Sequence, residues 1–171
     1  IPAILNEVDI VFTMLPSGLV VKEIVTQFIN NFSAESTLID CSTIDVKTTK
    51  EVCQTLGNKK IHMLDAPVSG GVIGADAGTL TFMCGGDKDS FEKAKPILQG
   101  MGKNIVHCGS GGLGQATKIC NNMLAGINAL AAAEAMTMGE RLGVSPDILY
   151  EVISTSTGRS YIFETSNPMP D

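Results

Sequence analysis

Residues 37–56 read TLIDCSTIDVKTTKEVCQTL, a short apolar run followed by a turn and an amphipathic stretch. The run at 37–41 predicts a buried strand. The stretch at 45–56 carries apolar residues at three-and-four spacing, which predicts a helix with Asp45 as its N-cap. A strand, a turn and a helix in this order form the repeating unit of a parallel sheet covered by helices.

The same alternation extends through most of the chain and places it in the α/β class. We expect further strands at residues 8–15, 61–66, 80–84 and 104–108, and further helices at 19–30, 88–98 and 145–154. Asp87 and Ser145 stand where N-caps of the last two helices belong, and Pro146 suits a first helical position.

One long helix is predicted between Gly114 and Gly143, because this stretch contains no proline and would extend roughly 42 Å. Within residues 123–136 only Asn128 and Glu134 are polar. A helix that is apolar on every side is expected to be buried on every side, as a spine between two packed units. A membrane span is the alternative, but polar side chains interrupt every window of about 20 residues.

The amino-acid composition and net charge exclude several functional classes. The chain has 171 residues, 44% hydrophobic and 18% charged, with a formal net charge of -6. These values are typical of a globular protein, and the negative charge argues against binding to nucleic acid or anionic membranes. The five cysteines show no CxxC spacing and the two histidines stand far apart, so we expect no metal site and a reducing compartment. The opening Ile1-Pro2 and the lack of a final helix stop lead us to expect an excerpt from a longer protein.

Residues 109–114 read GSGGLG and match the dinucleotide-binding pattern G-x-G-x-x-G between a strand and a helix. That pattern requires an acidic residue at the end of a second strand, after a short helix. Glu134 has the right separation but lies deep inside the long predicted helix. We therefore interpret the glycines as a tight entry to that helix, not as a phosphate loop.

Residues 65–71 read DAPVSGG and follow the third predicted strand. The carboxyl ends of strands face the ligand crevice in open α/β sheets, and consecutive Ser69-Gly70-Gly71 peptides can turn N–H groups toward a small anion. An ordinary turn between strands is the alternative interpretation.

Gly114, Lys118 and Asn122 are spaced four residues apart at the start of the long helix. This spacing places the lysine and the asparagine on one face, with the glycine leaving room for a ligand beside the lysine. A partly buried lysine loses proton affinity and becomes suited to acid–base chemistry near neutral pH. A solvated surface lysine is the alternative.

Two further strand ends carry Leu15-Pro16 and Ser42-Thr43. Their backbone groups and hydroxyls can donate hydrogen bonds to the ribose and nicotinamide half of a dinucleotide. Local capping of the following helix by Asp40 or Thr43 is the alternative.

Taken together, Leu15-Pro16, Ser42-Thr43, the DAPVSGG string and residues 114–123 (GQATKICNNM) closely resemble the β-hydroxyacid dehydrogenase family. The resemblance covers nearly the whole chain in the expected order. It implies the later part of a Rossmann-type parallel sheet over residues 1–109, incomplete at its N-terminus. It also implies a long interdomain helix and the start of an all-helical domain over residues 110–171. The family's glycine fingerprint, and the residue that chooses NAD over NADP, would precede this chain.

The resemblance also implies residue roles. Lys118 corresponds to the family's catalytic lysine. Ser69, Gly70 and Gly71 would hold the substrate carboxylate, and Asn122, with Asn121 beside it, would contact the substrate. The positions that would touch NAD are Leu15, Pro16, Ser42 and Thr43.

The implied activity is hydride transfer from a small 3-hydroxy acid to NAD, with NADP as the alternative cofactor. The string at 118–123 favours 3-hydroxyisobutyrate, oxidised to methylmalonate semialdehyde in valine catabolism. A homo-oligomer is implied, in the mitochondrial matrix of a eukaryote or the cytoplasm of a bacterium. A tartronate or succinate semialdehyde reductase of the same family and a catalytically silent ligand-binding fragment are the alternatives.

Overall fold

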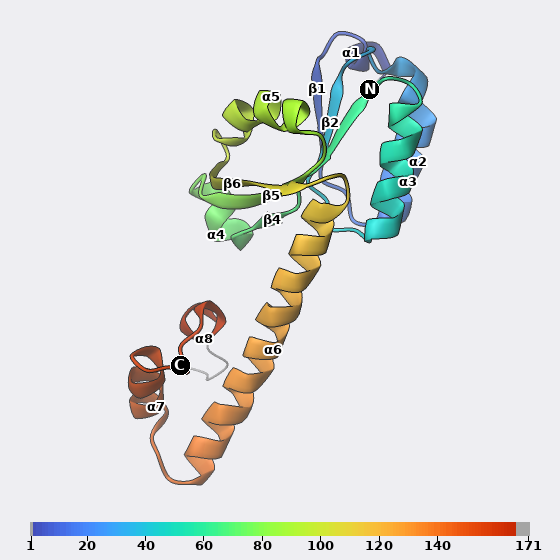
Figure 1. Cartoon of the computed structure of the whole chain (residues 1–171). Helices are drawn as coiled ribbons and strands as arrows, with labels where there is room; N and C mark the ends of the chain where they lie inside the picture. The colour runs from blue at the N-terminus through green and yellow to red at the C-terminus, as the bar shows by residue number, and fades with distance from the viewer. Residues whose placement is uncertain (1, 167–171) are drawn as a thin grey trace. The chain divides into compact units, whose positions relative to one another are not determined.

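The computed structural model describes residues 2–166, which fold into a sheet with flanking helices followed by one long helix and two short ones (Figure 1). The strands are β1 (Ile10–Thr13), β2 (Thr37–Asp40), β3 (His62–Asp65), β4 (Val68–Ser69), β5 (Leu80–Gly85) and β6 (Gly102–Gly109). The helices are α1 (Pro2–Leu5), α2 (Gly18–Phe28), the 3-10 turn η1 (Ile29–Asn31), α3 (Val46–Gly57), α4 (Gly71–Asp76), α5 (Lys88–Leu98), α6 (Leu113–Arg141), α7 (Pro146–Ser154) and α8 (Tyr161–Thr165). The chain divides into two units, Ile1–Ile119 and Cys120–Asp171, and each is described by itself.

The sheet of the first unit is mostly parallel, which confirms the predicted α/β class. Its strand order is β1-β2-β3-β5-β4, with β6 also paired to β5. β1, β2 and β3 run parallel, with Thr13 opposite Asp40 and Asp40 opposite Asp65, and β5 and β6 are parallel as well. The carboxyl ends of the first three strands therefore meet at one edge of the sheet.

Two antiparallel pairings depart from the expected parallel sheet. β3 meets β5 through Asp65 and Gly85, and β4 runs antiparallel to β5. Only two residues separate β3 from β4, and α4 is a helix of six residues. A parallel crossover needs a dozen or more connecting residues, so these short connections turn the chain back instead. A two-residue strand such as β4 has no periodicity that a sequence pattern can detect.

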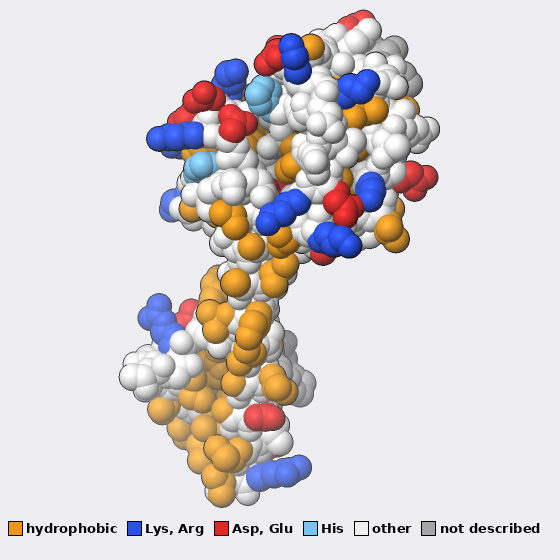
Figure 2. Space-filling model, turned by 45° about the vertical axis from the view of Figure 1, so that its right-hand side comes forward, with side chains coloured by type: hydrophobic (Ala, Val, Ile, Leu, Met, Phe, Trp, Pro, Cys, Tyr) orange, Lys and Arg blue, Asp and Glu red, His pale blue; other side chains and the backbone are white. Residues whose placement is uncertain are grey.

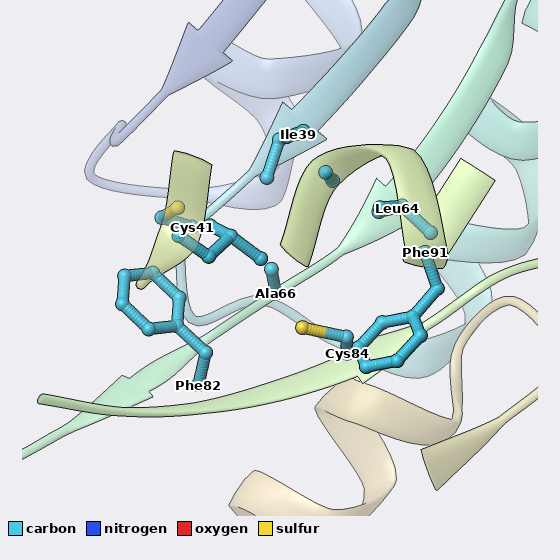
Figure 3. Close-up of a cluster of buried hydrophobic side chains, with 9 residues drawn as sticks. Ile39, Cys41, Leu64, Ala66, Phe82, Cys84 and Phe91 are labelled. Carbon is cyan, nitrogen blue, oxygen red and sulfur yellow. The ribbon is translucent and has the colours of Figure 1, made fainter. Parts of the chain in front are cut away.

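Successive residues along the central strands supply the cores on opposite faces of the sheet. Leu38 and Met63 pack with Val21 of α2 and Val52 of α3 on one face. A second set covers the other face under α5, namely Ile39, Cys41, Leu64, Ala66, Phe82, Cys84, Phe91, Ala94 and Leu98, most of them shown in Figure 3. These two layers fix the strands whose ends carry the candidate site.

The helix caps follow the sequence closely. Asp45, Asp87 and Ser145 each accept a backbone N–H from the first turn of the helix they precede, as predicted, and Pro146 opens α7. α5 begins and ends at the residues expected for it, whereas α1, α4 and α8 were not predicted. The capping residues therefore set the helix starts on both faces of the sheet.

Helix α6 has 29 residues, which corresponds to about 43 Å, but the expectation that it is buried on every side is wrong. Met123, Leu124 and Leu130 are 66%, 60% and 62% exposed. In the second unit, Ala132 and Met136 are buried against residues of α7 and α8. These two short helices are the described elements that cover it there, so most of its apolar surface stays open, and Figure 2 shows hydrophobic side chains over this unit. No helix among residues 2–166 is long and apolar enough to cross a membrane.

Candidate active site at the carboxyl ends of the strands

The ends of β1 and β2 bring two predicted cofactor-binding segments together. Thr13 and Asp40 are register partners, so Leu15-Pro16 and Ser42-Thr43 leave neighbouring strands at the same edge. Pro16 and Thr43 are exposed there, and Leu15 is partly buried. The adjacent ends of parallel strands form the crevice in which α/β folds bind ligands.

Ser42 has a different role from the one predicted for its side chain. It is fully buried, and its hydroxyl donates to Asp40 Oδ1 (2.5 Å) while accepting the backbone N–H of Leu15 (2.8 Å). Asp40 Oδ1 also accepts the Thr13 hydroxyl (2.9 Å). The Ser42 hydroxyl thus ties the two strand ends together and is not available to a ligand. The capping alternative is also wrong for Asp40 and Thr43, because Asp45 caps α3.

The end of β3 is joined to the start of α6 by one carboxylate. Asp65 is fully buried, and its Oδ1 accepts the Gly112 N–H (2.7 Å) while its Oδ2 accepts the Gln115 N–H (2.8 Å). Burial raises the pKa of Asp65 to about 6, since the loss of solvation outweighs the donated hydrogen bonds. These amides are the ones that a phosphate loop would use, so the glycine run at 109–114 serves as a helix entry, as interpreted above.

Gln115 joins the same turn of α6 to the end of β2. Its side-chain amide nitrogen donates to the Ser42 carbonyl (2.7 Å), and its Oε1 accepts the Ile44 N–H (3.1 Å). The residue is fully buried. Sequence reasoning missed both Asp65 and Gln115. The available signal was Asp65, a lone acidic residue near the end of the apolar run at 61–66. A buried carboxylate needs N–H donors, and the start of a helix supplies them.

Gly114 does not make room for a ligand, contrary to the prediction. A Cβ at this position would clash with the carbonyl oxygens of Met83 and Asp65. The absent side chain lets the first turn of α6 approach the sheet. Gly85 has the same function from the sheet side, because a Cβ there would meet Asp65 Oδ1 and the Gly114 nitrogen.

The predicted substrate loop begins at Ser69, four residues after Asp65. Val68 and Ser69 form β4 against Phe82 and Thr81 of β5. Gly70 and Gly71 then take positive φ angles of 131° and 61°, and both are exposed. A Cβ on Gly71 would meet nothing within 4 Å, so open space lies beside this backbone.

Lys118 lies one turn into α6 and is half-buried, and burial lowers the pKa of its amine. It forms no ion pair within residues 2–166. The alternative of a fully solvated lysine is therefore wrong. No cluster of three or more His, Cys, Asp or Glu in the same residues is placed to hold a metal ion.

Asn121 and Asn122 follow in the same helix and belong to the second unit. Both are exposed, and the Asn121 amide donates to Asn122 Oδ1 at 3.5 Å. In the first unit, the hydrogen bonds of Asp65 and Gln115 link the helix of Lys118 to the strand ends that carry the other predicted residues.

Two families of known proteins match this chain. Residues 1–109 match the family described as the NAD binding domain of 6-phosphogluconate dehydrogenase. Residues 112–170 match the family described as NAD-binding of NADP-dependent 3-hydroxyisobutyrate dehydrogenase.

Individual relatives agree with these matches. A probable 3-hydroxyisobutyrate dehydrogenase of Mycobacterium tuberculosis is 43% identical over 99% of this chain and 58% of the relative. The mitochondrial 3-hydroxyisobutyrate dehydrogenase of Homo sapiens is 42% identical over 96% of this chain and 50% of the relative. A solved structure of the Mycobacterium tuberculosis 3-hydroxyisobutyrate dehydrogenase with L-serine has a TM-score of 0.94 at 42% identity, covering 99% of this chain and 58% of that one. The chain thus spans about half to three-fifths of the length of these relatives.

Proposed function

Because the chain belongs to the β-hydroxyacid dehydrogenase family, we propose that the whole protein oxidises 3-hydroxyisobutyrate to methylmalonate semialdehyde with NAD. The observation that carries the proposal is Lys118, a half-buried amine of lowered pKa in a helix that Asp65 fastens to the end of β3. Identity of 42% to 44% to proteins named 3-hydroxyisobutyrate dehydrogenase supports the choice of substrate.

Lys118 is proposed as the general base for the substrate hydroxyl. The nicotinamide, when bound, accepts the hydride from the alcohol carbon. As that C–H bond breaks, the O–H bond must also break, and the neutral amine of Lys118 takes the proton and becomes an ammonium. Partial burial favours the neutral form before the reaction, and the same group returns the proton when the aldehyde is reduced.

The substrate carboxylate is proposed to lie at Ser69, Gly70 and Gly71. The open space beside Gly71 and the absence of side chains on both glycines let a carboxylate approach the backbone closely. The solved relative contains L-serine, which is itself a small acid with a hydroxyl on its third carbon. Asn122, with Asn121 beside it, is proposed to orient the reacting oxygen.

The cofactor is proposed to contact Leu15, Pro16 and Thr43, with Ser42 holding these segments in place. The exposure of Pro16 and Thr43 at adjacent strand ends fits a ligand that lies across the carboxyl edge of the sheet. NAD is the proposed acceptor, and NADP is the alternative named in one of the two matching families.

Replacing the lysine tests this proposal. In the whole protein, Lys118→Ala should lower kcat by about 10²-fold or more, because a general base is lost, while KM for NAD stays within about threefold. Lys93→Ala is the matched control, because Lys93 is an exposed lysine of α5 in the same unit. A kcat for Lys118→Ala within about threefold of the unaltered protein would contradict the assignment.

The alternatives differ in substrate or in the absence of activity. Steady-state rates on 3-hydroxyisobutyrate, tartronate semialdehyde and succinate semialdehyde separate the dehydrogenase from a semialdehyde reductase. Calorimetry with NAD on residues 1–171 and on the whole protein tests the alternative of a silent fragment. We expect weak or absent binding to residues 1–171 alone and ordinary binding to the whole protein. Mitochondrial and bacterial relatives support a matrix or cytoplasmic location according to the host, and a homo-oligomer is proposed with it.

A further inference from the structure

We propose that Asp65 and Gln115 are positioning residues for Lys118, which fix the first turn of α6 to the ends of β3 and β2 and so hold the amine in reach of the substrate oxygen. The inference rests on the proposed function, because it takes Lys118 as the acid–base group. It assigns a role to two buried polar residues that the proposed chemistry does not use.

The first observation concerns the residues to which Asp65 is hydrogen-bonded. Its carboxylate holds the amides of Gly112 and Gln115, separated from it by 47 and 50 residues in sequence. Gln115 precedes Lys118 by three residues, which is about 4.5 Å along the helix axis and less than one turn. Asp65 precedes Ser69 by four residues. The Asp65 carboxylate therefore connects the two parts of the proposed site. It is four residues from the substrate loop along the backbone, and it is hydrogen-bonded to the turn of α6 that precedes Lys118.

The second observation is that Gln115 makes the corresponding link to β2. Both polar atoms of its side chain bond to backbone atoms of Ser42 and Ile44, on either side of Thr43. Thr43 is the exposed residue proposed to touch the cofactor. The turn of α6 that precedes Lys118 is thus fastened to both neighbouring strand ends, one on the substrate side and one on the cofactor side.

The third observation is that the acceptor for the first amides of α6 comes from another element of the fold. Five other helices are capped by their own N-cap residues, namely Ser17, Asp45, Asp87, Ser145 and Ser160. Gly112 precedes α6 with a φ of 90°, a conformation that a serine or aspartate rarely adopts, so α6 has no local side-chain cap. Here the acceptor comes instead from a strand, and Gly85 and Gly114 lack the side chains that would keep helix and sheet apart. Such a contact sets the position of the helix start relative to the strand, which a local cap cannot do.

The expected kinetic effect is on turnover. A misplacement of about 1 Å can cost about 10²-fold in rate, so loosening one of the two links should cost about 10-fold or more in kcat. The effect on kcat should disappear in a protein that lacks the Lys118 amine, because that amine is the group being positioned. Asp65→Asn should therefore lower kcat in the whole protein and cause no further loss when added to Lys118→Ala, with KM for NAD within about threefold throughout.

Gln115→Met is the second variant, since it keeps the length of the side chain and removes both hydrogen bonds. Leu98→Ala is the stability control, because Leu98, the last residue of α5, is fully buried in the core and forms none of these hydrogen bonds. It should lower the melting temperature and leave kcat unchanged.

The outcomes separate this inference from the proposed function. If Lys118→Ala loses about 10²-fold while Asp65→Asn and Gln115→Met stay within threefold, the positioning proposal fails and the function stands. If Lys118→Ala has no effect, the function itself fails. Equal losses from Asp65→Asn with and without Lys118 would show that Asp65 does not act through the lysine. If neither positioning variant folds while Leu98→Ala does, the two residues are structural and the proposal is overturned.

Discussion

Replacing Asp65 by asparagine should change how the stability of this protein depends on pH. The carboxyl is fully buried, and burial raises its pKa from 3.8 to about 6 although it accepts two backbone N–H groups. The folded state therefore binds a proton more tightly than the unfolded state does. Between about pH 4 and pH 6 the free energy of unfolding should fall as the pH rises, and above pH 6 this contribution should be constant.

The size of the effect follows from the two pKa values. The difference between about 6 and 3.8, at about 1.36 kcal/mol for each pH unit, gives about 3 kcal/mol lost between acid and neutral pH. Asparagine carries no charge, so this loss disappears in the variant. The neighbouring titratable groups do not interfere, because burial raises the pKa of the thiols of Cys53 and Cys84 to about 12 and both stay neutral.

Asparagine retains one acceptor oxygen, so one of the two helix amides loses its partner, which costs about 1–3 kcal/mol. At neutral pH this loss offsets the relief from burying a charge, and Asp65→Asn should be about as stable as the unaltered protein or up to about 2 kcal/mol more stable. The expectation follows from the cost of burying a charge that has no cationic partner.

Urea denaturation of the whole protein, followed by circular dichroism at half-unit steps from pH 4 to pH 8, measures this difference. Subtracting the variant from the unaltered protein cancels the contributions of the other carboxyls. Over this pH range the difference should fall by about 2–3 kcal/mol and level off above pH 6. A difference that is flat, or that rises with pH, would refute the reasoning, because the donated hydrogen bonds would then outweigh burial.

Two further predictions concern glycines at the site. Gly114→Ala should lower the free energy of unfolding by about 1–3 kcal/mol and lower kcat, since its Cβ would collide with the backbone of β3 and β5; urea denaturation and steady-state rates measure both, and unchanged values would contradict the close approach. Gly71→Ala places a side chain at a φ of 61° in open space, so it should raise KM for the hydroxy acid at a stability cost of about 1–2 kcal/mol, whereas an unchanged KM would remove this residue from the proposed carboxylate site.

The elements that the sequence predicted best are those with strong local signals. α5 begins after Asp87 and ends at Leu98 as expected, because a capping aspartate and a three-and-four apolar spacing are both contained in the segment. β4 and α4 were missed because their pairing with β5 and the short connections around them depend on contacts with other strands. The prediction that α6 is buried on every side was wrong. Apolar composition indicates that a helix favours burial, but it does not determine which other elements cover the helix.

The sequence could suggest candidate site residues only where a residue type and its spacing indicate a chemical role. Lys118 was selected from the sequence by its four-residue spacing from Gly114 and Asn122 and by the resemblance to the dehydrogenase family. The roles of Ser42 and Gly114 could not be predicted, because they depend on the Leu15 N–H after the neighbouring strand and on two carbonyl oxygens in other strands. Asp65 was visible as part of a motif, but its function depends on amides about 50 residues away.

These contacts explain why a buried carboxylate that lowers the stability of the fold is hydrogen-bonded to the turn that precedes the proposed catalytic lysine. A glycine-rich loop enters α6, so its first amides have no local side chain to bind, and a carboxylate from the sheet supplies the acceptor at the expense of a buried charge. Fixing a helix start to a strand end restricts the sliding that a locally capped helix would retain. Since general acid–base catalysis requires the amine within hydrogen-bond reach of one oxygen, a stability cost at Asp65 is consistent with selection for the position of Lys118. A variant that is more stable at neutral pH and slower in turnover is the combination that this reasoning requires.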